Sequence, residues 1–202
     1  MTQLQAQAHQ RPHTVAILRE LIETVLLAVA IFIGVNMISA RFRISGDSME
    51  DTFHDGQYII VNRLAYRFSP PAHGDVVVFV PSESISANFW EKLLGRPGQT
   101  DFIKRVIAVP DDAVKIDSGH LYVNGTQILE PYLYEPMRPQ ETQYWRLEAG
   151  QYLVMGDNRN FSKDSRAEHI GPVPIEQIVG KVWAVYFPLQ ELRIVRPHRN
   201  QD

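Results

Sequence analysis

The sequence lacks cysteine altogether: none occurs among its 202 residues. Without a thiol, the chain cannot form a disulfide framework, a thiol nucleophile or a zinc site with cysteine ligands. An excess of positive charge is also missing, because 20 Lys and Arg stand against 23 Asp and Glu, giving a net charge of -3. We therefore expect no nucleic-acid binding, which needs a basic surface. The missing cysteine does not place the chain on either side of a membrane.

Metal-ligand spacing is absent as well. The seven histidines stand at positions 9, 13, 54, 73, 120, 169 and 198. No two of them have the HExxH spacing or another spacing typical of metal ligands. We expect scattered surface or turn histidines, no metal and no cofactor.

Charged residues are missing from residues 24–40, TVLLAVAIFIGVNMISA. A run of this length is at the lower limit for a helix that crosses a hydrocarbon core of about 30 Å. The apolar pattern extends back to Thr14, so we predict a transmembrane anchor helix over 14–40, preceded by a disordered segment over 1–13. A buried soluble helix would give a similar run. So would a cleaved signal peptide ending near Ala40, although its apolar core would be unusually long.

Beyond the run, the sequence changes to short segments rich in Val, Ile, Tyr and Phe that are separated by Pro, Gly, Asn and Asp. This texture predicts a mainly β fold with an antiparallel sheet domain over 41–195 and a polar tail over 196–202. Asn124-Gly125 suits the type I′ turn of a hairpin. We expect strands within 57–64, 75–80, 101–109, 113–128, 151–155 and 181–187.

Residues 81–100 interrupt the strand pattern. Phe89, Trp90, Leu93 and Leu94 have helical spacing in this segment. Two interpretations stay open: a short helix packed on the sheet edge, or an interfacial segment that touches lipid.

Ser48 is the first residue that could carry out chemistry. It lies in ISGDSMEDTF, shortly after the apolar run and close to Gly46, which permits unusual backbone angles. A serine hydroxyl is a poor nucleophile until a neighbouring base takes its proton. Taken alone, the segment also fits an ordinary turn.

Lys104 is a candidate for that base. In DFIKRVIAV the alternation of a strand places Phe102, Lys104 and Val106 on one face and Arg105 on the other. The two cations cannot both reach water easily if either face packs, and burial lowers the pKa of a lysine. A reduction of about 2.5 units from about 10.4 makes the neutral amine abundant near pH 7.5, at a cost of roughly 3.4 kcal/mol. A lysine that extends to solvent from an amphipathic strand is the alternative.

Residues 156–166, GDNRNFSKDSR, form a third polar segment. Many Asp, Asn, Arg and Ser residues that can hydrogen-bond one another occur within this short segment, which indicates a rigid polar loop. A solvated turn between strands would look similar.

Together these segments resemble the signal peptidase I family, in the order which that family uses. The joint match covers residues from about 25 to 185 and implies a serine endopeptidase with the antiparallel β fold of the family. The matching segments are SGDSM (45–49) for its nucleophile box, GDVVVF (74–79) for its next strand box, FIKRVIAVP (102–110) for its base-bearing box, LYVNG (121–125), EPYL (130–133) and GDNRNFSKDSR (156–166) for its last box.

The resemblance implies a role for each catalytic position. Ser48 would attack the scissile carbonyl, and neutral Lys104 would take its proton and later protonate the leaving amine. Ser162 would hydrogen-bond Lys104 and orient it, while Asp164 and Arg166 would form an ion pair that stiffens the loop. The backbone N–H of Ser48 would form part of the oxyanion hole.

The chain departs from the family pattern at several positions. A serine side chain sometimes supplies the second oxyanion donor where this chain has Gly46, so that donor stays open. The family usually has Pro-Thr-Leu where residues 51–53 read Asp-Thr-Phe, and it usually has Gly at the positions of Ala108 and Asp111. These differences concern loop and strand geometry rather than the reacting groups.

Substrates and location also follow from the resemblance. Exported preproteins would be cut after small residues, at sites of the Ala-x-Ala type. The protein would be a single-pass protein of a bacterial plasma membrane, with its catalytic domain on the extracytoplasmic face. Membrane lipid and the protein-export machinery would be further partners. Charge alone does not orient the anchor, because Arg11 and Arg19 precede the run and Arg41 and Arg43 follow it.

Substrate contacts are implied by the resemblance in the same way. Ile44, Met49, Phe102 and Ile103 would line shallow pockets for small side chains. The peptide would lie extended and pair with strand edges.

Three other functions are also considered. A self-cleaving Ser–Lys protease shares the same chemistry, but the apolar run and the GDNRNFSKDSR segment argue against it. A Ser–His–Asp hydrolase using one of the histidines would stay active after Lys104→Ala. A non-catalytic β-rich binding module would show no change in cleavage after Ser48→Ala.

Overall fold

A computed structural model describes residues 11–81 and 101–198. The chain divides into two compact units, residues 1–38 and 39–202. The two interpretations of residues 81–100 concern a segment that lies, from 82 onward, outside the described residues.

One helix, α1 (Arg11–Ile38), makes up the described part of the first unit. It begins inside the segment expected to be disordered, and it ends before Ser39, which already belongs to a strand. The uncharged part of this helix is residues 24–38, because the preceding turns contain Arg19, Glu20 and Glu23. This part is about 22 Å long at 1.5 Å per residue. Within the part of the chain that the structure describes, no helix has the length and apolar character needed to cross a membrane. The predicted helix is confirmed, and it ends at Ile38, two residues before its predicted end at residue 40.

The second unit is built on a large antiparallel sheet. Its strand order is β1-β2-β11-β3-β4-β9-β10, and β12 pairs with β11. The strands are β1 (Ser39–Arg43), β2 (Tyr58–Asn62), β3 (Val76–Phe79), β4 (Phe102–Ala108), β9 (Gln151–Met155), β10 (Val173–Pro174), β11 (Ile178–Phe187) and β12 (Arg193–Ile194). Short helical turns connect them: α2 (Ala65–Phe68), η2 (Arg159–Phe161), η3 (Ile175–Gln177) and η4 (Leu189–Glu191).

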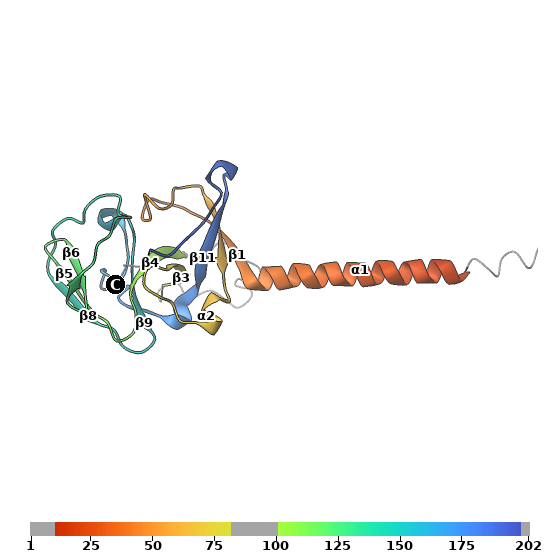
Figure 1. Cartoon of the computed structure of the whole chain (residues 1–202), viewed down its shortest axis with the longest axis horizontal. Coiled ribbons are helices and arrows are strands. Elements are labelled where there is room, and N and C mark those ends of the chain that lie inside the picture. The colour runs from red at the N-terminus through yellow and green to blue at the C-terminus, as the bar shows by residue number, and fades with distance from the viewer. Residues whose placement is uncertain (1–10, 82–100, 199–202) are drawn as a thin grey trace, which may run out of the picture. The chain divides into compact units, whose positions relative to one another are not determined.

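A second, four-stranded antiparallel sheet follows β4 and has the order β7-β6-β5-β8. Its strands are β5 (Ala113–Asp117), β6 (His120–Val123), β7 (Thr126–Gln127) and β8 (Gln143–Arg146). Figure 1 shows β5, β6 and β8 together at the end of this unit away from β1 and β11. Asn124 and Gly125 both have positive φ, 52° and 82°, and join β6 to β7. A type I′ turn needs this sign at both central residues, so the predicted hairpin is confirmed.

The mainly β, antiparallel fold is also confirmed. The predicted segments contain β2, β3, β4, β5, β6, β7, β9 and most of β11. The strands that the sequence did not reveal are β1, β8, β10 and β12. The last two have only two residues each, which is too short for alternation to be visible. In β1, the first two residues, Ser39 and Ala40, are the last two of the apolar run and were assigned to the anchor.

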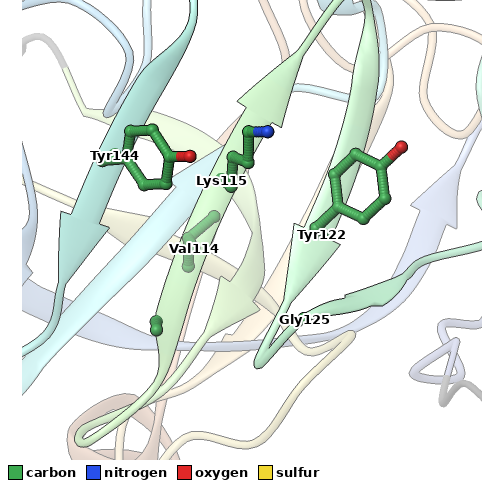
Figure 2. A pocket seen from close by; sticks show the side chains of 6 residues that line it. Val114, Lys115, Tyr122, Gly125 and Tyr144 are labelled. Atoms are coloured by element: carbon green, nitrogen blue, oxygen red, sulfur yellow. The ribbon is translucent and has the colours of Figure 1, made fainter.

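A shallow hollow of about 320 Å³ lies on the smaller sheet. Figure 2 shows Lys115 between Tyr144 and Tyr122, which come from the two strands that flank β5. An ion pair of 2.5 Å with Asp117 balances the charge of Lys115. The hollow is lined by none of the predicted site residues.

A buried ion pair anchors the segment after β7 to the loop after β9. The guanidinium of Arg159 is fully buried and donates to both carboxylate oxygens of Glu130, at 2.7 and 2.5 Å. Its Nε donates to the carbonyl oxygen of Gly156 at 3.0 Å. Removing one partner of such a pair leaves an uncompensated charge in the interior.

We predict that Glu130→Ala lowers the free energy of unfolding by about 3–5 kcal/mol, because the charge of Arg159 loses its partner. Urea unfolding of the full chain measures the loss. Glu148→Ala, at an exposed position, is the matched control and should have little effect. A loss below about 1 kcal/mol for Glu130→Ala would show that the pair does not hold the loop.

Candidate functional site

Two side chains far apart in sequence meet at the centre of the larger sheet. Ser48 lies in the loop between β1 and β2, and Lys104 lies within β4. Lys104 Nζ and Ser48 Oγ are 2.7 Å apart, a hydrogen-bond distance. The amine also donates to the carbonyl oxygen of Ile103 at 2.8 Å and lies 5.5 Å from the centre of the Phe102 ring. The structure therefore brings together the two residues that the sequence singled out.

Lys104 is removed from water, with 1% of its surface exposed. Burial lowers the pKa of its amine from 10.5 to about 8; the charges of Asp164 and Asp157 act against the shift, and that of Arg166 adds to it. With a pKa of 8, about a tenth of the amine is neutral at pH 7, compared with less than about a thousandth for an ordinary lysine.

The next residue of β4 shows how a buried cation is balanced when a carboxylate lies beside it. Arg105 is equally buried, but it donates from Nε and Nη2 to the carboxylate of Asp157, at 2.8 and 2.6 Å. No ion pair to Lys104 occurs in residues 11–81 and 101–198. One cation of β4 is thus neutralised by a partner, while the other can become neutral only by losing its proton.

The loop that carries Ser48 is fixed from the side of β9. Asn158 donates its backbone N–H to the carbonyl oxygen of Ser48 and its side-chain amide to that of Asp47, both at 3.1 Å. On the inner side, Met49 and Phe53 are buried in the core. These contacts determine where the Ser48 hydroxyl can lie.

Gly156 permits this contact. A Cβ at this position would lie 2.3 Å from the Ser48 carbonyl oxygen and 2.3 Å from Ser162 Oγ. Any side chain would therefore push the loop after β9 away from the loop of Ser48. Sequence reasoning did not assign this glycine a role, although its place between an apolar strand and a polar segment is a signal for a close approach of two chains.

Ser162 differs from its expected role. Its Oγ is buried beside Gly156, but it makes no hydrogen bond with any described residue. The predicted hydrogen bond to Lys104 is therefore not formed in this structure. The hydroxyl lies close to the loop that carries Ser48, and its proximity to Asp164 helps to lower the pKa of that carboxyl.

The ion pair between Asp164 and Arg166 is present, with 2.8 Å between Oδ1 and Nε. Burial by itself raises the pKa of Asp164, but the hydrogen bond and charge of Arg166 bring it below its ordinary value. Asp164 also accepts the Gly156 N–H at 3.0 Å, and Arg166 donates to the Arg159 carbonyl oxygen at 2.6 Å. The pair therefore stiffens the loop that touches Ser48.

The four predicted pocket residues divide into two groups. Ile44 and Met49 are buried in the core, with 4% and 1% exposed, so they do not line an open surface as expected. Phe102 and Ile103 are half-buried at the start of β4 and can meet a ligand from outside.

Backbone donors near Ser48 were the remaining expectation. Among the described residues, the N–H of Ser48 has no hydrogen-bond partner, so it is available to an oxyanion. The N–H of Gly46 donates to Asp55 Oδ1 at 3.0 Å, so it is already in use.

The histidines lie elsewhere. His73 forms a 2.7 Å contact with Asp112, and His54 lies 3.6 Å from Glu50. No hydrogen bond joins a histidine to Ser48 in the part of the chain described, which disfavours a Ser–His–Asp site. In the same residues, no three His, Asp or Glu side chains are grouped so that they could hold a metal ion.

Sequence comparisons with known proteins agree with the family resemblance of the motifs. The family model described as "Signal peptidase, peptidase S26" matches residues 18–187. The chain is 34% identical over 178 residues to "Probable signal peptidase I-2" of Synechocystis sp., covering 87% of this chain and 76% of that protein. It is 34% identical to "Signal peptidase IB" of Staphylococcus aureus, covering 87% of this chain and 94% of that protein. A crystal structure of a signal peptidase I from Enterococcus faecalis superposes with a TM-score of 0.43 at 22% identity, covering 56% of this chain and 97% of that chain.

We predict that Lys104→Met stabilises the fold at pH 7 by about 3 kcal/mol, because it removes the cost of burying a charged amine. The folded-state pKa of about 8 lies below 10.5, so the cost is complete below pH 8 and fades as the pH rises to 10.5. Urea unfolding at pH 7 measures the full stabilisation, and at pH 10 it measures how much of the stabilisation has been lost. Lys163→Met, at an exposed position of the neighbouring loop, is the control. A less stable Lys104→Met protein at pH 7 would contradict the lowered pKa.

Proposed function

Because the chain belongs to the signal peptidase family, peptidase S26, and is thus a serine endopeptidase, we propose that it removes signal peptides from exported preproteins with Ser48 and Lys104 as its catalytic pair. The single observation that carries the proposal is the 2.7 Å contact between the Ser48 hydroxyl and a lysine amine withdrawn from water.

In the first step, neutral Lys104 accepts the proton of the Ser48 hydroxyl while Oγ attacks the scissile carbonyl carbon. The protonated amine then gives that proton to the nitrogen of the leaving peptide, and an ester on Ser48 remains. A water molecule, deprotonated by the now neutral amine, attacks the ester and releases the new carboxyl end. As the ester C–O bond breaks, the protonated amine gives the proton it took from water to Ser48 Oγ, so the hydroxyl and the neutral amine are restored.

The pKa of about 8 suits both halves of this cycle. A base works best when its pKa lies near the working pH, because it must be neutral before the attack and protonated after it. An ordinary lysine at pKa 10.5 would be a stronger base but would almost never be neutral. The hydrogen bond from the amine to the Ile103 carbonyl oxygen restricts the orientation of the amine, which helps to direct it toward Ser48.

The surrounding loop supports the pair without reacting. Asp164 and Arg166 keep the loop after β9 rigid, and Gly156 brings it against the Ser48 carbonyl. We assign Ser162 to orientation of the Lys104 amine once a substrate is bound, since its hydroxyl is buried beside the loop and unsatisfied. The free N–H of Ser48 would stabilise the oxyanion, a contribution of a few kcal/mol in typical acyl transfer.

We propose that the enzyme cuts after small substrate side chains, at sites of the Ala-x-Ala type. Phe102 and Ile103 offer half-buried apolar contacts beside Lys104, while Ile44 and Met49 fill the core behind the loop of Ser48. A core that is already filled leaves little depth for a large side chain. The substrate would lie extended and pair with a strand edge.

We propose that the protein contacts lipid at the extracytoplasmic face of a bacterial plasma membrane, near the export machinery. The apolar side chains of α1 are exposed, Phe32 to 68% of its surface. In the second unit, Trp183, Leu189 and Leu192 are exposed as well. Exposed apolar surface of this extent is typical of sites that meet a membrane or another protein. Lipid contact would also hold enzyme and membrane-bound preprotein in one layer.

The test is cleavage of a preprotein with an Ala-x-Ala site by the purified full chain in detergent. Ser48→Ala and Lys104→Met should each lower the rate by at least about 10³-fold, because they remove the nucleophile and the base. Lys163→Met is the control and should cleave at the rate of the unchanged chain.

Two results would contradict the proposal. Activity retained in Lys104→Met would mean that another group acts as base. If the unchanged chain failed to cut the preprotein, a non-catalytic binding module would become the better explanation.

A further inference from the structure

Two residues near the C-terminus touch the loop that carries Ser48. We call residues 44–57, between β1 and β2, the nucleophile loop, and residues 189–194, which contain η4 and β12, the C-terminal turn. Two side chains of the C-terminal turn, Arg193 and Glu191, hydrogen-bond the nucleophile loop. Neither residue belongs to the catalytic pair or to the loop after β9.

Arg193 makes the more direct of the two contacts. Its Nη2 donates to the carbonyl oxygen of Thr52, and its guanidinium lies 5.5 Å from the centre of the Phe53 ring. Phe53 is fully buried, so the guanidinium covers a ring that is fixed in the core. Arg193 itself is held in place because β12 pairs with β11, with Arg193 opposite Val185.

Thr52 connects Arg193 to the catalytic pair. Its hydroxyl donates to Asp157 Oδ2 at 2.5 Å, while its carbonyl oxygen accepts from Arg193. Asp157 in turn holds Arg105, the neighbour of Lys104 on β4. Thr52 is therefore hydrogen-bonded both to the loop after β9 and to the C-terminal turn.

Glu191 strengthens the same contact at the base of the loop. Its carboxylate accepts a hydrogen bond from the side chain of Gln57, which is buried. Gln57 closes the nucleophile loop, because its carbonyl oxygen accepts the Ile44 N–H at 2.8 Å. The C-terminal turn thus contacts the loop both at its middle and at its closing pair.

We propose that Arg193 is a positioning residue for Ser48, holding the nucleophile loop in the place that Asn158 fixes from the other side. This inference rests on the proposed function. Without the Arg193 contact at Thr52 the nucleophile loop has more freedom to tilt, and a displacement of about 1 Å at the Ser48 hydroxyl can cost about a hundredfold in rate. Arg193 removes that freedom without touching the substrate.

The test compares Arg193→Ala with the unchanged chain on the preprotein substrate. We expect kcat to fall roughly 10- to 100-fold with KM changed less than about threefold, because the alignment of Ser48 suffers and peptide binding does not. Arg193→Lys should recover part of kcat, and free guanidinium ion at millimolar concentration should raise the rate of Arg193→Ala only. Arg196→Ala, an exposed position nearby, is the control.

The outcomes separate this inference from the proposed function. If the unchanged chain cleaves, Ser48→Ala does not, and Arg193→Ala keeps its kcat, only the positioning role is overturned. A loss that guanidinium does not rescue and that follows the thermal stability of the variant overturns it too, since it reports unfolding. If Ser48→Ala still cleaves the substrate, the proposed function falls and the role of Arg193 falls with it.

Discussion

The contact between Ser48 Oγ and Lys104 Nζ, made out of reach of water, is the interaction on which the rest of this structure depends. A hydroxyl is a useful nucleophile only beside a base, and an amine is a base only when neutral. Burial supplies neutrality at a cost in stability, and the pKa of about 8 measures that cost. The larger sheet bears this cost because β4, which carries Lys104, is paired on both sides.

A second constraint is the separation of Lys104 from its charged neighbours. Arg105, Arg159 and Arg166 are each paired with a carboxylate, at Asp157, Glu130 and Asp164 respectively. These pairs offset the negative charges around the site, so that Asp164 and Asp157 only partly counter the effect of burial on the pKa of Lys104. The same pairs give the loop after β9 its shape, so charge balance and loop geometry are one arrangement.

Alternation along β4 placed Lys104 and Arg105 on opposite faces, which predicted that the two cations could not both reach water easily; the structure buries both. Family motifs paired Lys104 with Ser48. Local patterns also predicted the Asn124-Gly125 turn. What could not be predicted depends on contacts between distant segments: the missing bond of Ser162, the close approach at Gly156 and the link from Arg193 to Thr52. Ile44 and Met49 were expected to line a substrate pocket, but both are buried. An apolar residue beside a nucleophile looks the same in sequence whether it faces the core or a substrate. Ser39 and Ala40 were assigned to the apolar helix because composition does not show where the helix ends and β1 begins.

The most direct test of the central claim is the protonation of the Lys104 amine itself. Titration of its side-chain nitrogen by NMR, with Lys104→Met to assign the signal, gives the pKa without any assay of cleavage. A midpoint near pH 8 is the predicted result. A midpoint above about 10, the value of a hydrated lysine, would contradict it, because the amine would then be charged whenever Ser48 needed a base.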